Sequence, residues 1–127
     1  MKAIGTDKAP AAIGPYSQAI EAGGFVFCSG QLGIDPSAGQ LISDDVAAQA
    51  EQVFRNIAAV LAARSLTLSN VVKTTVFLTS LDDFKAVNEI YARNFNGHKP
   101  ARSTVQVAAL PMKAKIEIEC IAAVEGK

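Results

Sequence analysis

The strongest constraint on the fold is a switch between two hydrophobic periodicities along the chain. Residues 71–79 are β-branched almost throughout, which is typical of a strand. On either side of this run, apolar residues recur at the three- and four-residue spacing of a helix with one apolar stripe. Only two segments carry that helical spacing, so the sequence predicts strands interleaved with two helices.

Both predicted helices have start signals. The first should begin near Ser43 or Asp44, whose side chains can accept a hydrogen bond from a free first-turn N–H. The second should follow 80–83, a variant of the capping box, and end at Asn96-Gly97. The apolar stripes are Val46, Ala50, Val53, Phe54, Ile57, Val60 and Leu61 in the first helix, and Phe84, Val87, Ile90, Tyr91 and Phe95 in the second.

Turn signals divide the rest of the chain into strands. Residues 18–21 and 25–28 flank a glycine turn and predict a hairpin whose second strand ends at Ser29-Gly30. Further strands are expected over 103–108 and 115–124. The resulting order, β-β-α-β-α-β-β, is an α+β or split α/β layout with two helices.

One face of this sheet should lack a cover, because two helices can cover only one face of a sheet this wide. The other face would carry Thr75, Phe77, Ile121 and Ala123 beside a few polar groups. A half-apolar face without helices predicts a homo-oligomer packed through the sheet.

Composition limits the class of protein. The 127 residues form one domain, 1–127, and a 50% hydrophobic content excludes a disordered chain. Twelve basic residues balance twelve acidic ones and are scattered, which argues against a nucleic-acid partner. No apolar stretch reaches the ~18 residues of a membrane span. The N-terminus lacks a secretory or transit pattern, so a cytoplasmic location is expected.

A metal centre is not expected either. Cys28 and Cys120 lie in apolar, strand-like runs, which predicts reduced, buried thiols. His98 is the only histidine that could join them, and a zinc site needs about three or four such ligands. No phosphate-binding glycine motif is present.

Two charged positions are candidates for chemistry. Arg102 lies near the start of a predicted strand, where it is either solvated or a guanidinium fork for a ligand carboxylate. Glu117 lies on the strand face that we expect a partner to cover, so its carboxylate is either paired or a general base. The sequence does not establish that the two side chains meet. On residue patterns alone, Tyr16 after Gly14-Pro15 and the Ser29-Gly30-Gln31 segment are interpreted as structural.

The segment 100–119, PARSTVQVAALPMKAKIEIE, closely resembles the signature of the RidA (YjgF-type) family of enamine/imine deaminases. Segments 11–20, 28–36, 71–91 and 116–124 resemble the pattern of the same family in the same order. The resemblance therefore covers essentially the whole chain.

The resemblance implies an α+β, chorismate-mutase-like fold: one mixed sheet with two helices on one face. It also implies a homotrimer whose sheets form an inner barrel, with a cleft between each pair of subunits. The implied activity is that of a 2-iminobutanoate/2-iminopropanoate deaminase. Such an enzyme hydrolyses 2-aminoacrylate and related enamines or imines, released by pyridoxal-phosphate enzymes, to 2-oxo acids and ammonia. No metal or organic cofactor is implied.

Site roles follow from the same resemblance. Arg102 matches the arginine that clamps the substrate carboxylate, and Glu117 matches the glutamate that positions the attacking water. Tyr16 matches a tyrosine lining the cleft. The remaining matched positions, all implied to bind substrate, are Ser29, Gly30, Gln31, Asn88 and Thr104. Thr104 stands where many members carry cysteine, and its backbone N–H can still bind a carboxylate oxygen.

Other functions fit the same residues. A non-catalytic trimer that binds 2-oxo acids would also need Arg102, so Glu117→Gln separates that role from catalysis. An endoribonuclease or translation inhibitor is a second alternative, which the neutral charge disfavours. A chaperone that acts through its surface would depend on neither residue.

Overall fold

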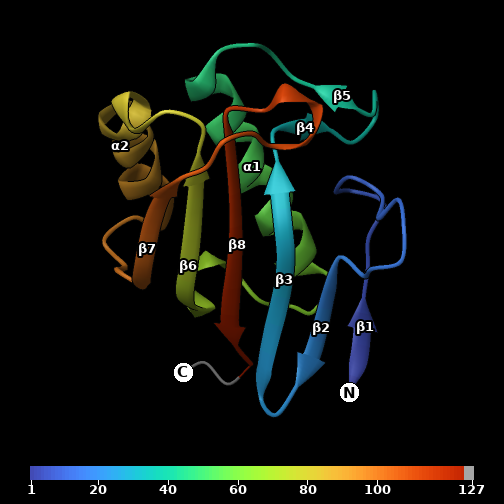
Figure 1. Ribbon diagram of the computed structural model, residues 1–127. Coiled ribbons are helices and arrows are strands. Elements are labelled where there is room, and N and C mark those ends of the chain that lie inside the picture. The colour runs from blue at the N-terminus through green and yellow to red at the C-terminus, as the bar shows by residue number, and fades with distance from the viewer. Residues whose placement is uncertain (125–127) are drawn as a thin grey trace.

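The computed structural model describes residues 1–124 and contains one mixed six-stranded sheet (Figure 1). Its strands, in spatial order, are β1 (Lys2–Ile4), β2 (Ala19–Ala22), β3 (Phe25–Leu32), β8 (Ile116–Ala123), β6 (Val71–Leu78) and β7 (Ala101–Gln106). Neighbours pair antiparallel except β6 and β7, which run parallel. A small hairpin of β4 (Ile34–Asp35) and β5 (Gln40–Leu41) encloses the predicted turn. The expected α+β class with a mixed sheet is confirmed.

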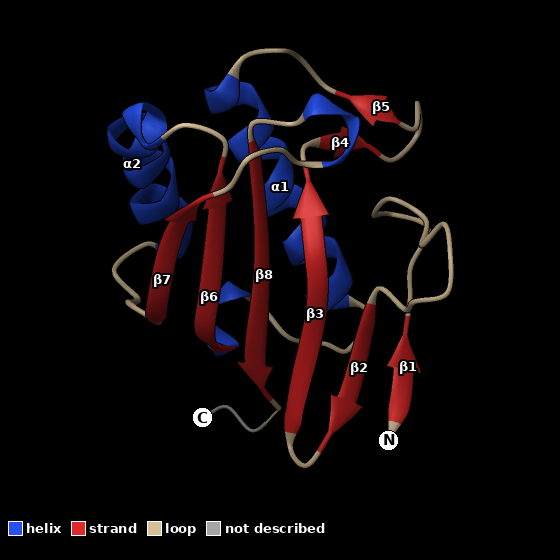
Figure 2. Ribbon diagram, viewed as in Figure 1, coloured by secondary structure: helices blue, strands red, loops and turns tan. Residues whose placement is uncertain are grey.

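Two helices, α1 (Val46–Ala62) and α2 (Phe84–Phe95), lie behind the sheet on the same face (Figure 2). Helix α1 begins slightly later than predicted, because the Asp45 carboxylate caps it by accepting from the Ala48 N–H. Ser43 instead accepts from the Asp45 N–H. Helix α2 follows a short 3₁₀ turn (Leu81–Asp83) capped by Ser80, and it ends at Asn96 in the left-handed region, as expected.

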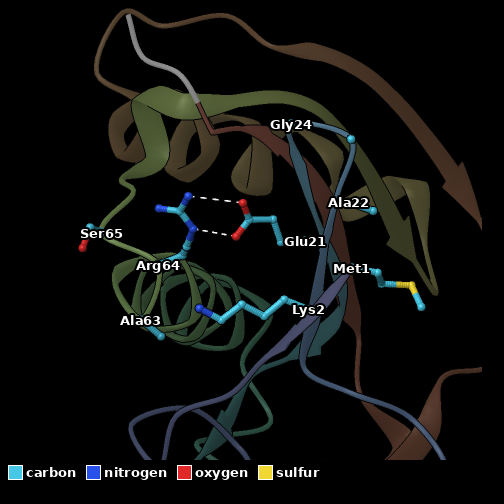
Figure 3. A pocket seen from close by; sticks show the side chains of 9 residues that line it. Met1, Lys2, Glu21, Ala22, Gly24, Ala63, Arg64 and Ser65 are labelled. Atoms are coloured by element: carbon cyan, nitrogen blue, oxygen red, sulfur yellow. Dashed lines mark hydrogen bonds and ion pairs between the residues drawn. The ribbon is translucent and has the colours of Figure 1, made fainter.

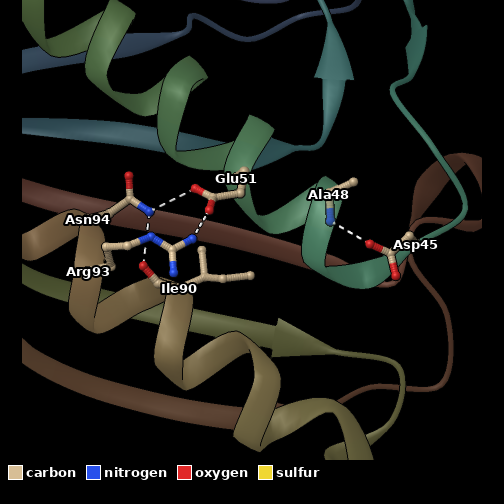
Figure 4. Close-up of polar contacts among 6 residues, drawn as sticks. All are labelled: Asp45, Ala48, Glu51, Ile90, Arg93 and Asn94. Atoms are coloured by element: carbon tan, nitrogen blue, oxygen red, sulfur yellow. Dashed lines mark hydrogen bonds and ion pairs between the residues drawn. The ribbon is translucent and has the colours of Figure 1, made fainter.

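Polar contacts join the helices to each other and to β2. Past the end of α1, the Arg64 guanidinium makes two hydrogen bonds to the Glu21 carboxylate of β2, at 2.6 and 3.2 Å (Figure 3). Within the helix pair, Glu51 of α1 accepts hydrogen bonds from Arg93 and Asn94 of α2 (Figure 4). These contacts fix α2 along α1.

The hydrophobic core lies between the sheet and the helices, and three aromatic rings join α1 to α2. Phe54 packs edge-on against Tyr91 and Phe95, with ring centroids 5.7 and 5.6 Å apart. Tyr91 and Phe95 are 4.7 Å apart. Edge-to-face packing of this kind adds to the free energy of burial and fixes ring orientation. The side chains of α2 outside this aromatic cluster therefore point in a fixed direction relative to the sheet.

Within residues 1–124 the opposite face of the sheet has no helix over it, as predicted. On β8 the side chains of Ile116, Ile118 and Cys120 are buried under the helices, whereas Glu117 and Ile121 lie on the open face. Phe27 of β3 is 45% exposed there. The open face is thus partly apolar and available for packing.

Four details of the strands differ from the sequence-based expectation. β7 spans Ala101–Gln106 and not 103–108. β3 does not end at Ser29-Gly30 but continues to Leu32 through a β-bulge. Strict alternation along 71–79 predicts Val72 on the face of Thr74 and Val71 on the face of Thr75. A second irregularity, between Val71 and Lys73 of β6, instead buries Val71 and leaves Val72 42% exposed, so this prediction is wrong for both residues. β1 was not predicted, because its three residues carry no alternation and form a strand only by pairing with β2.

In residues 1–124, no helix is long and apolar enough to cross a membrane.

Candidate active site

Five predicted site residues line one pocket of about 590 Å³ at the end of β3. They are Tyr16, Ser29, Gly30, Gln31 and Glu117. The remaining wall is mostly apolar and comes from the N-terminal loop, the end of β3, β4 and the turn before β8: Pro10, Ala11, Ile13, Gln18, Leu32, Ile34, Pro111 and Met112. We call this the glutamate half-site. A carboxylate in a largely apolar pocket is typical of an acid–base group.

The bulge in β3 shapes the glutamate half-site. Cys28 pairs with Cys120 and Gln31 with Ile118, so Ser29 and Gly30 together oppose one residue of β8. This extra residue bends the strand next to Glu117. A Cβ atom at Gly30 would lie 2.7 Å from the carboxylate carbon of Glu117 and 3.0 Å from its Cγ. Only glycine leaves room for the Glu117 side chain in this position.

Ser29 holds the N-terminal loop beside the pocket. Its hydroxyl donates to the Ser17 carbonyl at 2.6 Å, and its backbone N–H donates to the Gln18 carbonyl at 2.9 Å. Both donors are therefore used within the chain, and the hydroxyl oxygen can offer a ligand only an acceptor. Gln31 is 6% exposed, whereas Tyr16 is 54% exposed at the rim.

Gln18 is a supporting residue that the sequence analysis did not single out. Its buried side-chain amide accepts from the Thr6 N–H at 2.7 Å and donates to the Pro10 carbonyl at 2.7 Å. The Gln18 side chain thereby holds Thr6 and Pro10 of the loop that carries Tyr16. A lone glutamine before a strand gives no sequence signal for this role.

The environment of Glu117 favours its protonated form. Burial is the larger cause and the nearby negative charge of Glu119 the smaller, and together they raise the pKa of Glu117 above its usual range. A general base works best when its pKa lies near the operating pH. This shift therefore moves Glu117 toward the value that catalysis at neutral pH requires.

Arg102 and Asn88 line a second pocket, of about 460 Å³, between α2 and the start of β7. We call it the arginine half-site. The Arg102 guanidinium donates to the Asn88 Oδ1 at 2.7 Å. It also lies over the rings of Tyr91 and Phe84, 4.7 and 5.4 Å from their centroids. In residues 1–124 no carboxylate pairs with it, since the two ion pairs there use Arg64 and Arg93.

The two half-sites face opposite sides of the sheet. Arg102 aligns with Thr74, whose side chain is buried under the helices, whereas Glu117 aligns with Phe77 on the open face. Arg102 and Glu117 therefore do not meet within one chain. Thr104 lines neither pocket, and its hydroxyl is buried without a hydrogen-bond partner in the described part of the chain.

The other features of the fold are explained structurally. A pocket of about 450 Å³ surrounds the Glu21–Arg64 ion pair (Figure 3), and Lys2 also lines it. The His98 Nε2 lies 2.6 Å from the Val71 carbonyl oxygen. Cys28 and Cys120 are buried and free, as predicted. Residues 1–124 contain no group of three side chains placed to hold a metal ion.

The fold combines a mixed sheet with two helices on one face, a β-bulge beside Glu117 and an arginine that pairs with no carboxylate in residues 1–124. Sequence comparison shows the family to which a chain with these features belongs. The pattern of the family described as Endoribonuclease L-PSP matches residues 6–124. The chain therefore belongs to this family, the RidA (YjgF-type) proteins.

Similar proteins carry deaminase names. Reactive Intermediate Deaminase A, chloroplastic, from Arabidopsis thaliana is 58% identical over 119 residues, which are 94% of this chain and 64% of that protein. The 2-iminobutanoate/2-iminopropanoate deaminase of Mus musculus is 51% identical over 95% of this chain and 90% of its own length. The chain thus spans under two thirds of the Arabidopsis protein and nearly all of the mouse one.

Two solved structures share the whole fold. RidA from the Antarctic bacterium Psychrobacter superposes with a TM-score of 0.93 at 50% identity, over 97% of this chain and 99% of that one. TdcF of E. coli, solved with bound serine, gives 0.92 at 44% identity, over 97% and 98%.

Proposed function

We propose that this chain is a 2-iminobutanoate/2-iminopropanoate deaminase, which hydrolyses reactive enamines and imines of the 2-aminoacrylate class. Relatives at 51–58% identity bear that activity in their names. The structural observation that carries the proposal is the guanidinium of Arg102, which is oriented by Asn88 yet has no carboxylate partner in residues 1–124. Such a cation is suited to bind the carboxylate of a small 2-imino acid.

The working site, in this proposal, forms between subunits of a homotrimer. Arg102 of one subunit would meet Glu117 of the next, since the two lie on opposite faces of their own sheet. The partly apolar open face, with Phe27 45% exposed, supports packing of the sheets into an inner barrel with the helices outside. This is the chorismate-mutase-like arrangement, with residues 1–127 acting as a single RidA-like domain.

Each half-site supplies a different part of the reaction. Arg102 binds the substrate carboxylate as a fork, helped by the backbone N–H of Thr104, and Asn88 holds the fork in place. Glu117 accepts a proton from a water that attacks the imine carbon. The nitrogen of the resulting carbinolamine takes this proton back from Glu117, the C–N bond breaks as the hydroxyl proton passes to Glu117, and a 2-oxo acid and ammonia leave. Tyr16, Ser29, Gly30 and Gln31 line the pocket around the water.

The chemistry needs little acceleration, because such imines also hydrolyse unaided. A rate gain of ten- to hundredfold corresponds to lowering the barrier by only ~1.4 to 2.8 kcal/mol. Positioning of one carboxylate and one water is sufficient for a gain of this size. The reaction as written uses no metal, no organic cofactor and no thiol, which fits Thr104 at the position where many family members carry cysteine.

The test is imine hydrolysis in competition with semicarbazide. An amino-acid oxidase generates the imine, and the semicarbazone is followed by its absorbance. Wild type should suppress semicarbazone formation, and Arg102→Ala should lose at least about 30-fold in kcat/KM. Arg102 is exposed in the single chain, but in the proposed cleft the next subunit covers its contact with the substrate, and truncating one member of a buried charge contact costs about 2–5 kcal/mol. Lys85→Ala, which removes an exposed cation of α2 that lines neither pocket, is the matched control and should behave as wild type.

Glu117→Gln distinguishes an enzyme from a binding protein. It should abolish hydrolysis while leaving the affinity for a 2-oxo acid within about threefold. Wild type that binds 2-oxo acids but hydrolyses no imine from several amino-acid precursors would overturn the proposal in favour of a non-catalytic 2-oxo-acid-binding trimer.

A ribonuclease activity is the second candidate, because the family description names an endoribonuclease. The formal net charge of zero gives little electrostatic attraction for phosphates. RNA cleavage with an affinity that falls steeply with salt would favour this candidate.

We also propose a cytoplasmic location without a nucleic-acid or membrane partner. The free thiols of Cys28 and Cys120 support a reducing compartment. The scattered, balanced charges support a small-molecule substrate.

A further inference from the structure

Arg102 is held by one face of helix α2. Phe84, Asn88 and Tyr91 follow one another at spacings of four and three residues, which places them in a row along the helix. All three contact the Arg102 guanidinium, the two aromatic residues through their ring faces and Asn88 through its amide oxygen. We name this row the guanidinium shelf.

Every group of the shelf is neutral. A ring face attracts a cation through its quadrupole, and an amide oxygen does so through its dipole, so neither cancels the charge of the guanidinium. A glutamate in the same place would hold Arg102 equally well but would compete with a substrate carboxylate. The shelf therefore orients the cation and leaves its charge available.

The shelf is itself rigid. The Tyr91 hydroxyl shares a hydrogen bond of 2.7 Å with Thr74 of β6, and its ring packs against Phe54 and Phe95. Glu51 ties the next turn of α2 to α1 through Arg93 and Asn94 (Figure 4). Burial raises the pKa of Tyr91, with smaller opposing effects from the Thr74 hydrogen bond and the Arg102 charge, so the ring stays un-ionised at neutral pH.

We propose that Phe84 and Tyr91 are positioning residues for the carboxylate clamp, and that their rings preorganise the Arg102 guanidinium for the substrate. The inference rests on the proposed function for its kinetic consequence, but the orientation of Arg102 can be measured without any substrate. A preorganised clamp strengthens binding of the carboxylate in the ground and transition states alike. Loss of a ring should therefore raise KM and leave kcat nearly unchanged.

The experiment compares Phe84→Leu and Tyr91→Leu with Phe95→Leu. Phe95 is a buried ring of the same helix and the same aromatic cluster, but it belongs to no cation–ring contact with Arg102. We expect KM, and the Kd for a 2-oxo acid, to rise about 2- to 30-fold in each shelf variant, with kcat within about twofold of wild type. Phe95→Leu should lose thermal stability without this change in KM. Phe84→Tyr and Tyr91→Phe retain the ring and should restore KM.

A second measurement does not depend on catalysis. The Nε–H resonance of Arg102 is assigned by its absence in Arg102→Lys. In wild type, the ring currents of Phe84 and Tyr91 should shift this resonance. In Phe84→Leu and Tyr91→Leu it should move toward the position of a solvated arginine. An unchanged resonance in both variants would overturn the inference, as would an unchanged KM together with an unchanged Kd. If wild type hydrolyses no imine, the proposed function fails, whereas the resonance still decides whether the shelf exists.

Discussion

At the scale of single residues, the account depends on two side chains held in opposite electrostatic states. The charge of Arg102 is not cancelled by its neighbours, which are neutral. Glu117 is pushed toward its protonated form, mainly by burial and further by Glu119. A charged clamp and a carboxylate of raised pKa are what binding an anion and activating a water require.

The raised pKa of Glu117 has a cost in stability that can be measured. Between the ordinary value of 4.5 and the raised pKa of the folded protein, the folded state binds more protons than the unfolded state, so stability falls as pH rises through this window. Glu117→Gln removes the ionisation. The variant should therefore melt at a higher temperature than wild type at pH 7.5, and this difference should disappear below the ordinary value of 4.5. Thermal denaturation at several pH values is the measurement. A variant destabilised equally at all pH values would contradict this explanation of the pKa.

At the scale of secondary structure, the β3 bulge is the feature that builds the glutamate half-site. It sets Ser29 and Gly30 against one residue of β8 and brings the Gly30 backbone onto the Glu117 carboxylate. The function of the bulge thus depends on the absence of a side chain at Gly30.

Gly30→Ala should therefore impair catalysis more than folding. The added Cβ would lie 2.7 Å from the Glu117 carboxylate carbon, so the side chain must rotate out of the pocket. We expect kcat to fall about tenfold or more, which is less than the ~100-fold that complete loss of a general base typically costs, with the affinity for a 2-oxo acid nearly unchanged. Gly5→Ala is the matched control, because its Cβ would meet only the Gln18 side-chain oxygen, at 3.4 Å. Equal kinetics of the two variants would show that the position of Glu117 does not depend on Gly30.

The bulge is also a feature that could not be predicted from the sequence. The two helices were predicted nearly correctly, because caps such as Ser80 and Asn96 and the apolar stripes are local signals. The bulge was interpreted as a strand end, because it is defined by pairing with β8, about ninety residues further along the chain. The swap of Val71 and Val72 between faces has the same cause.

The candidate site was located mainly through family resemblance. Residue patterns alone left Tyr16 and Ser29 as structural residues, and Ser29 does hold the loop through both of its donors. Phe84 and Tyr91 were assigned to the core stripe of a helix, since nothing in their spacing shows that an arginine from a later strand lies across them. Side chains that act through a contact distant in sequence carry no local signal.

In the whole molecule, one chain holds two separate half-sites. The glutamate half-site opens beside the uncovered sheet face, and the arginine half-site lies under α2 at the edge strand β7. If, as proposed, Arg102 of one subunit meets Glu117 of the next, activity depends on assembly, because a monomer would hold both residues without a complete site.

Mixing two inactive variants tests this claim most directly. Arg102→Ala and Glu117→Gln are each expected to be inactive alone, and the two would be co-expressed with different tags or unfolded and refolded together in equal amounts. If each cleft takes Arg102 from one subunit and Glu117 from the next, every mixed trimer regains one complete cleft. Random assembly then restores about a quarter of the wild-type activity. Each variant refolded alone is the control, and the mass of the mixture should be near three times the 13.3 kDa of the chain. A mixture that forms mixed trimers yet stays inactive would show that Arg102 and Glu117 act within the same subunit, and it would contradict the account.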